Sequence, residues 1–129
     1  MTDNTKERNL IAYAVHENGD HGPVNVKDDL TALQESVGGY IDIVTRHIGA
    51  KGRPYIIVCD DEGCLRGRKT TAVFEGKRAL VGDLLILRKG RNGKLDSLTD
   101  DDINYVSDSM LKIYSYTDRE VVGHALELV

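Results

Sequence analysis

The sequence predicts an α+β fold, in which a single small sheet, mixed or antiparallel, has two or three helices packed on it. Three observations predict this fold. Residues 31–44 contain a short helical pattern, a double glycine and the start of a strand. Residues 54–59 and 80–88 are short aliphatic runs bounded by turn signals, which is typical of buried strands. Thr99 precedes an acidic turn at residues 100–102 and so predicts the start of a second helix.

The chain before residue 29 predicts a hairpin. Residues 10–15 form the first expected strand. The Asn-Gly-Asp sequence at residues 18–20 forms the turn, because Asn and Gly tolerate positive φ angles. Residues 23–26 form the return strand, and Pro23 stands at its start, where a missing N–H group does no harm.

The helix expected at residues 29–37 has apolar side chains at i, i+3 and i+7, which places them on one face. A short carboxylate, Asp28 or Asp29, caps its first turn. The double glycine at residues 38–39 supplies the left-handed conformation that closes a helix without steric cost. A strand follows at residues 40–45, which are rich in strand formers.

The second half of the chain predicts strands around the helix that follows Thr99. Residues 71–74 form a brief strand. The strand at residues 80–88 contains Gly82-Asp83, which indicates a bulge or a kink. In the tail, residues 112–116 alternate like a strand, and capping-box spacing predicts a last helix at residues 117–126.

Length and composition predict a single domain over residues 1–129, with a flexible start at residues 1–9. A chain of 129 residues buries enough apolar surface to fold without a metal or disulfides. No apolar run approaches the ~20 residues of a membrane span. The polar start, of mixed charge, resembles neither a signal peptide nor a transit peptide. We therefore expect no membrane partner and a cytoplasmic location, which is the host cytoplasm if the protein is phage-encoded.

The sequence contains no phosphate loop, dinucleotide fingerprint or nucleophile elbow, so we expect no cofactor and identify no catalytic residue. Cys59 and Cys64 flank a turn-like segment. We interpret them as reduced thiols rather than zinc ligands, since His16 and His21 are the only obvious further donors. The aspartates at residues 100–102 lack the spaced ligands of a calcium loop. We therefore identify no metal ligands.

Basic side chains concentrate in one segment. Residues 64–94 contain nine basic and two acidic side chains, whereas residues 1–63 and 95–129 are acidic. We expect the basic side chains to lie along one side of the sheet. They form a face for nucleic acid, a phosphorylated small ligand or an acidic protein surface, or else a solvated face balanced by acidic helices. The predicted face consists of Arg66, Arg68, Lys69, Lys77, Arg78, Arg88, Lys89, Arg91 and Lys94.

Four segments resemble a known family. They are Leu33–Asp42, Ile57–Gly67, Val81–Leu87 and Leu98–Asp100. Their order and spacing resemble the family catalogued as domain of unknown function 3846, whose members are found in bacteriophages and mobile elements. The resemblance covers roughly residues 24–105 as a family-like core. It leaves residues 106–129 as a C-terminal extension of helix and strand.

The sequence departs from the family pattern within and after the second of these segments. Asp60 stands where the family usually has Asn, and Cys64 stands where it has Lys. Residues 68–71 replace a stretch that begins with Leu-Pro in the family. A ligand site formed there in the family would therefore differ in this chain. The resemblance implies a phage or plasmid accessory protein and no particular activity.

Three functions follow as hypotheses. The first, which we favour, is a non-enzymatic accessory protein whose basic face binds a host protein, nucleic acid or phosphorylated small molecule, for example to inhibit a defence system. The second is a small enzyme that acts on a nucleotide-like substrate through Cys59, Cys64 or a histidine. The third is a structural module that forms homo-oligomers through a sheet edge. The charge blocks and the resemblance motivate the first.

Overall fold

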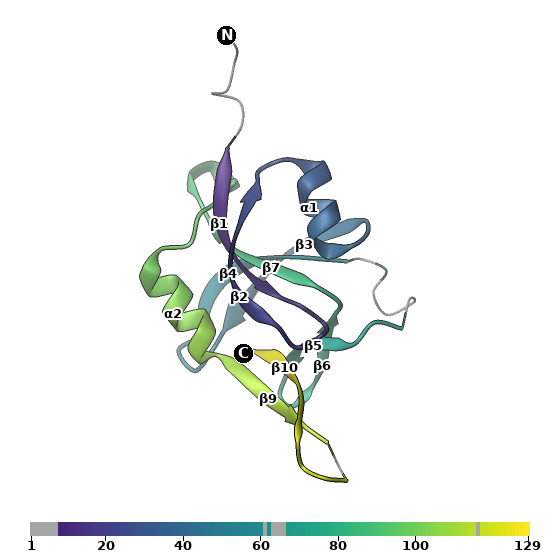
Figure 1. Ribbon diagram of the computed structural model, residues 1–129. Helices are drawn as coiled ribbons and strands as arrows, with labels where there is room; N and C mark the ends of the chain where they lie inside the picture. The colour runs from purple at the N-terminus through teal and green to yellow at the C-terminus, as the bar shows by residue number, and fades with distance from the viewer. Residues whose placement is uncertain (1–7, 61, 63–66, 116) are drawn as a thin grey trace.

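The computed structural model describes residues 8–60, 62, 67–115 and 117–129 (Figure 1). Within these residues, ten strands form one sheet, with two α-helices and one short 3-10 helix. The predicted α+β fold is therefore wrong, because the protein is mostly β and its sheet is large. The elements are β1 (Asn9–Val15), β2 (His21–Lys27), α1 (Leu30–Val37), β3 (Ile41–Ile48), β4 (Arg53–Asp60), β5 (Thr70–Phe74), β6 (Lys77–Val81), β7 (Leu84–Lys89), η2 (Arg91–Gly93), β8 (Leu95–Asp96), α2 (Asp100–Asp108), β9 (Met110–Tyr114) and β10 (Val121–Leu128).

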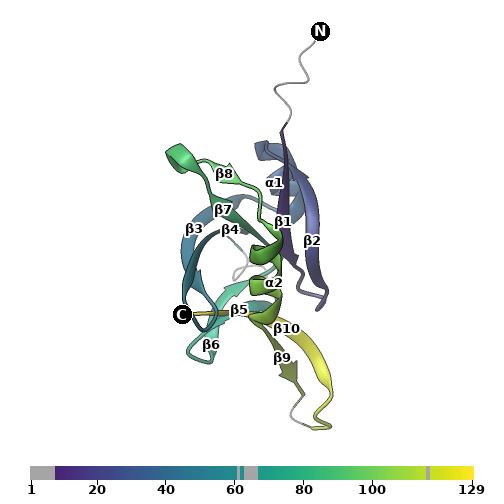
Figure 2. The ribbon, with the colours of Figure 1, turned by 90° about the vertical axis from the view of Figure 1, so that its left-hand side faces the viewer.

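The sheet has the strand order β2-β1-β7-β4-β3-β10-β5-β6, with β8 paired to β7 and β9 paired to β10. Its pairs are antiparallel except for β10 and β5, which run parallel. The sheet coils, as Figure 2 shows, so that strands distant in this order come together. The turn between β1 and β2 meets β10, where the Nδ1–H of His124 donates to the Gly19 carbonyl oxygen at 3.0 Å.

Strands β1, β4 and β7 are buried on both faces. Side chains such as Tyr13, Ile57 and Ile86 point into the core enclosed by the coiled sheet and α2. Their sequence neighbours point the opposite way and pack under α1, as Val58 and Leu85 do. Two-sided burial explains why these strands read as continuous apolar runs rather than as alternating patterns.

Both predicted helix starts are confirmed. The Asp29 side chain accepts a hydrogen bond of 2.7 Å from the Ala32 backbone N–H and caps α1. Gly38 then ends α1 in the left-handed conformation at φ 78°. Thr99 caps α2 and forms a reciprocal capping box with Asp102. Local capping chemistry therefore fixes both helices.

Two sequence expectations need correction. The strand predicted at residues 80–88 is two strands, because Gly82 turns the chain at φ 78° and its N–H donates to the Lys69 carbonyl at 2.8 Å. The helix predicted at residues 117–126 is absent. Val121 begins β10 instead, which pairs with β9 and β5. Its β-branched start favours a strand, and ladder bonds outweigh the local capping pattern.

Candidate anion-binding site

The predicted basic face is not one surface. Arg68 lies inside the protein, whereas Lys69 and Arg78 line a groove between strands. Four others, Arg88, Lys89, Arg91 and Lys94, belong to β7, η2 and the turn toward β8. Lys77 is exposed at the start of β6, and Arg66 lies outside the described residues.

Arg68 is a structural residue. Its Nε donates to Glu17 at 2.7 Å, and one terminal nitrogen donates to Asp60 at 2.9 Å and to the Val37 carbonyl. The Asp60 side chain is fully buried, and the Arg68 side chain is 18% exposed. Burial acts to lower the pKa of Arg68, but the bonds to Asp60 and Glu17 raise it overall. Arg68 therefore carries a permanent internal charge.

Two glycines of the predicted motifs make room for Arg68. A Cβ at Gly38 would lie 3.1 Å from a guanidinium nitrogen, and one at Gly82 would lie 3.0 Å from the Arg68 Cδ. Both glycines also have positive φ angles, which side-chain-bearing residues adopt at a cost. The end of α1, the end of β4 and the turn after β6 thus converge on one arginine. We call Arg68, Glu17 and Asp60 the Arg68 cluster.

The groove lies where β5 and β6 face β9 and β10, and we call it the strand groove. It consists of two adjoining hollows with volumes of about 440 and 380 Å³. The first hollow is lined by Thr70, Val73, Gly76, Arg78, Leu111, Lys112, Ile113 and Ala125. The second is lined by Glu17, Lys69, Thr70, Arg78, Ile113, Val122, Gly123 and His124.

Three cations surround the strand groove. Lys69 precedes β5, Arg78 is on β6 and Lys112 is on β9, and all three residues are exposed. The parallel pairing of β5 with β10, together with the antiparallel pairing of β10 with β9, brings Lys112 to this groove. None of the three forms an ion pair with a carboxylate anywhere in the described chain. Glu17 also lines the groove, but it is bonded to Arg68.

A histidine pair stands at the His124 end of the strand groove. The His21 and His124 rings make an edge contact with centroids 4.8 Å apart. The buried Tyr13 hydroxyl shares a hydrogen bond of 2.6 Å with His21 Nδ1. Burial, and then the neighbouring His124, lower the pKa of His21, while Asp20 opposes them. These contacts attach the β1–β2 turn to the strand that forms this end of the groove.

A second cationic hollow, of about 320 Å³, lies beside α2. It is lined by Thr45, Arg53, Pro54, Tyr55, Arg88, Lys89 and Asp102. Its arginines are engaged: Arg53 bonds Asp101, a residue of α2, and Arg88 lies 3.5 Å from Asp102. Tyr55 donates to Asp102 at 2.9 Å, and burial together with this bond raises the pKa of Tyr55 to about 12. Lys89 completes the lining. We call this the α2 hollow.

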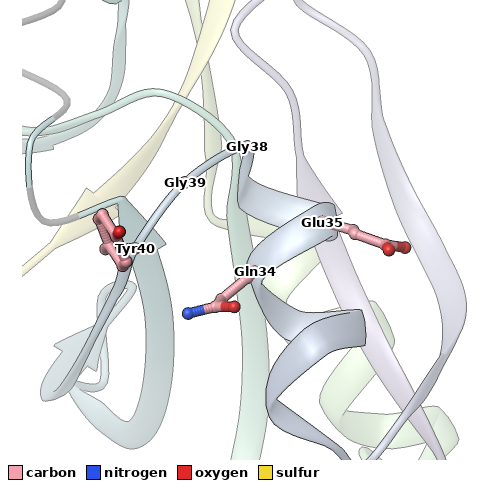
Figure 3. Close-up of a pocket in the computed structure, with 5 residues that line it drawn as sticks. All are labelled: Gln34, Glu35, Gly38, Gly39 and Tyr40. Carbon is pink, nitrogen blue, oxygen red and sulfur yellow. The ribbon is translucent and has the colours of Figure 1, made fainter.

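Figure 3 shows a third hollow, of about 340 Å³, at the carboxyl end of α1. Gln34 and Tyr40 point to one side of the helix end, and Glu35 points away from them. Gly38 and Gly39 both donate to the Gln34 carbonyl, at 2.8 and 3.1 Å. The described part of the lining contains no cation, and a helix carboxyl end disfavours negative charge, so this hollow does not suit an anion.

The remaining predicted features have simple outcomes. Cys59 is buried in β4, while Cys64 falls outside the described residues. Among the residues described, no group of three or more His, Cys, Asp or Glu side chains is placed to hold a metal ion. Neither of the α-helices in that part of the chain is long and apolar enough to cross a bilayer.

Sequence reasoning identified Lys69 and Arg78 but missed Lys112, Thr70 and His124 as groove residues. Lys112 lies in an acidic block, outside the basic segment. It joins the groove only through the β9–β10–β5 pairing. The alternating pattern at residues 112–116 predicted a strand, and β9, which ends at Tyr114, confirms it. No local pattern in the sequence indicates which strands β9 and β10 pair with.

Comparison with family models finds a match to the model described as "Domain of unknown function (DUF3846)", over residues 11–111. This match begins before the predicted core, at β1, and extends through α2 into β9. It includes the Arg68 cluster but stops before β10, which completes the strand groove. Searches of curated proteins and of solved structures gave no match.

Proposed function

Starting from the fact that the chain belongs to the DUF3846 family, we propose that it is a non-enzymatic accessory protein of a phage or mobile element that binds a phosphorylated small molecule in the strand groove. One observation carries this proposal: Lys69, Arg78 and Lys112 line a single groove, and none of them forms an ion pair with a carboxylate of the described residues. An anion entering the groove gains charge-assisted hydrogen bonds without first displacing an internal ion pair.

The strand groove suits a small ligand better than a polymer. Its hollows of about 440 and 380 Å³ fall in the usual range for small-molecule sites. Val73, Ile113 and Ala125 provide an apolar floor beside the cations. The acidic net charge of −4 opposes long-range attraction of duplex nucleic acid. Sequestering such a ligand from host signalling is the form of defence inhibition that this site supports.

The test is isothermal titration calorimetry with inorganic pyrophosphate at low salt. We expect saturable binding to the wild-type protein. Arg78→Gln should weaken it by more than about tenfold, because a hydrogen bond to a charged group contributes about 1.5–3 kcal/mol. Lys69→Gln should weaken it in the same direction. Arg91→Gln is the matched control, since Arg91 is exposed in η2 and belongs to the same basic segment.

Each outcome of the titrations leads to a definite conclusion. Wild-type affinity in Arg78→Gln, or a loss confined to Arg91→Gln, would contradict the strand groove as the site. Absence of pyrophosphate binding to the wild-type protein would contradict the proposal as a whole. Phosphorus NMR of the same mixture, and of a nucleoside triphosphate mixture, should show no conversion. Conversion would favour the enzyme hypothesis instead.

A further inference from the structure

The strand groove has two compartments of similar size. The first is lined mainly by β5, β6 and β9, and the second mainly by the segment before β5 and the start of β10. Thr70, Arg78 and Ile113 line both, so they stand at the junction. A guanidinium and a hydroxyl at this junction suit a phosphate placed between two bulkier groups.

Each compartment has its own floor and its own cation. Leu111 and Ala125 belong to the first compartment, together with Lys112. Val122 belongs to the second, together with Lys69. The apolar surface suits the faces of flat base rings, while the lysines suit phosphate oxygens. The arrangement repeats the same chemistry on both sides of the junction.

The second compartment also offers a base-reading group. Glu17 Oε2 accepts a hydrogen bond from Arg68 Nε at 2.7 Å, which fixes the carboxylate. The backbone N–H of Glu17 donates to the Asp83 side chain. Glu17 Oε1 receives no hydrogen bond from the described residues. A fixed carboxylate oxygen accepts hydrogen bonds from an exocyclic amine such as that of adenine.

From this geometry we propose that the ligand of the strand groove is a dinucleotide, with one nucleoside in each compartment and the linking phosphate at Arg78 and Thr70. This inference rests on the proposed function and names its ligand class. The second nucleoside carries an amine-bearing base beside Glu17. A mononucleotide fills one compartment and leaves the other to water.

The experiment compares three probes by calorimetry: adenosine monophosphate, linear diadenylate and cyclic diadenylate. We expect one dinucleotide per chain, bound about a hundredfold more tightly than the monophosphate, because joining two binding groups makes the second contact intramolecular. The tighter of the linear and cyclic probes identifies the linkage. Equal affinity per nucleotide, with two monophosphates per chain, would overturn the dinucleotide while leaving phosphate binding intact.

A hollow-filling variant tests the second compartment alone. Gly123 has an ordinary φ, and the nearest atom to an added Cβ is Ile113 Cδ1 at 3.9 Å, so a side chain begins there without a clash, and valine favours a strand. Gly123→Val should reduce dinucleotide affinity to the monophosphate level while pyrophosphate still binds. Gly22→Val is the control, since Gly22 lies in β2 with no atom within 4 Å of its added Cβ. Undiminished dinucleotide binding in Gly123→Val would overturn the proposal. If Gly123→Val also lost pyrophosphate binding, the assignment of the phosphate site to Arg78 and Thr70 would be wrong.

Discussion

The Arg68 cluster and the strand groove draw their arginines from one basic segment, and the two sites use them in opposite ways. Arg68 donates to Glu17 and Asp60 and is mostly buried. Arg78 is exposed and forms no ion pair with a carboxylate of the described residues. Lys69, the residue after Arg68, already faces the groove. A run of basic residues therefore contains both a structural charge and a candidate binding charge, and carboxylate partners decide between them.

The α2 hollow is the intermediate case and shows why exposure alone is a poor guide. The Arg88 side chain is 47% exposed, yet it lies 3.5 Å from Asp102. Burial acts to raise the pKa of Asp102, but hydrogen bonds from Thr99 and Tyr55 lower it overall, so its carboxylate stays charged. An anion at Arg88 therefore meets a fixed negative charge. In the strand groove, none of the three cations forms an ion pair with another described residue, and the lining carboxylate of Glu17 is bonded to Arg68 instead.

The largest expected effect is on the Arg68 cluster. Arg68→Met removes the charge-assisted bonds from Arg68 to Glu17 and to the buried Asp60 carboxylate, and we expect the free energy of unfolding to fall by about 3–5 kcal/mol. Urea denaturation followed by circular dichroism measures this change. Arg91→Met, at an exposed position, should change stability by about 0.5 kcal/mol or less. If both variants lost the same small amount, Arg68 would be a surface charge and the comparison would fail.

The next effect separates backbone strain from crowding by Arg68. Gly76 and Gly82 have nearly equal φ angles of 77° and 78°, but an added Cβ meets Arg68 only at Gly82. Gly76→Ala should cost about 1 kcal/mol for the left-handed conformation. Gly82→Ala should cost about 1–2 kcal/mol more, because it overpacks the cluster. In the Arg68→Met background this excess should shrink. Equal costs for the two glycines would show that Arg68 does not constrain position 82.

Local signals in the sequence predicted much of the fold. The caps at Asp29 and Thr99, the double glycine and the apolar run at residues 54–59 each depend on neighbouring residues, and the structure confirms them. The helix predicted in the tail is wrong because Thr117 begins a local capping pattern, whereas pairing with other strands makes the segment β10. Its partners are β5, which is distant in the sequence, and β9, which lies across a turn. The fold class failed for the same reason.

The candidate site was harder to predict than the fold. Composition located a basic segment but gave no information on which carboxylates fold against it. Glu17 and Asp60 lie in the acidic first block, and their contact with Arg68 depends on the coiled sheet. Lys112 lies at the groove because its strand, β9, pairs with β10, which in turn pairs with β5. Charge blocks therefore indicate where cations are abundant, while only tertiary contacts identify those left to bind a ligand.

The smallest expected effect concerns the histidine end of the strand groove. Burial and His124 lower the pKa of His21 below its ordinary 6.5, so the folded protein binds fewer protons there than the unfolded chain. The free energy of unfolding should therefore fall as pH drops below about 6.5 and level off below the folded pKa. Urea denaturation between pH 8 and 5 measures the slope, and His21→Gln should remove that part of it.

NMR titration of the His21 ring supplies the direct control, because carboxylates elsewhere in the chain also begin to titrate toward pH 5. A midpoint below 6.5 in the wild-type protein is expected. Replacing the neighbour, in His124→Gln, should raise that midpoint, since the electrostatic effect of His124, whose ring centroid lies 4.8 Å from that of His21, lowers the pKa of His21. A midpoint at or above 6.5 would mean that the β1–β2 turn does not hold His21 against β10. The second compartment of the strand groove would then lack its fixed end, whereas the Arg68 cluster would be unaffected.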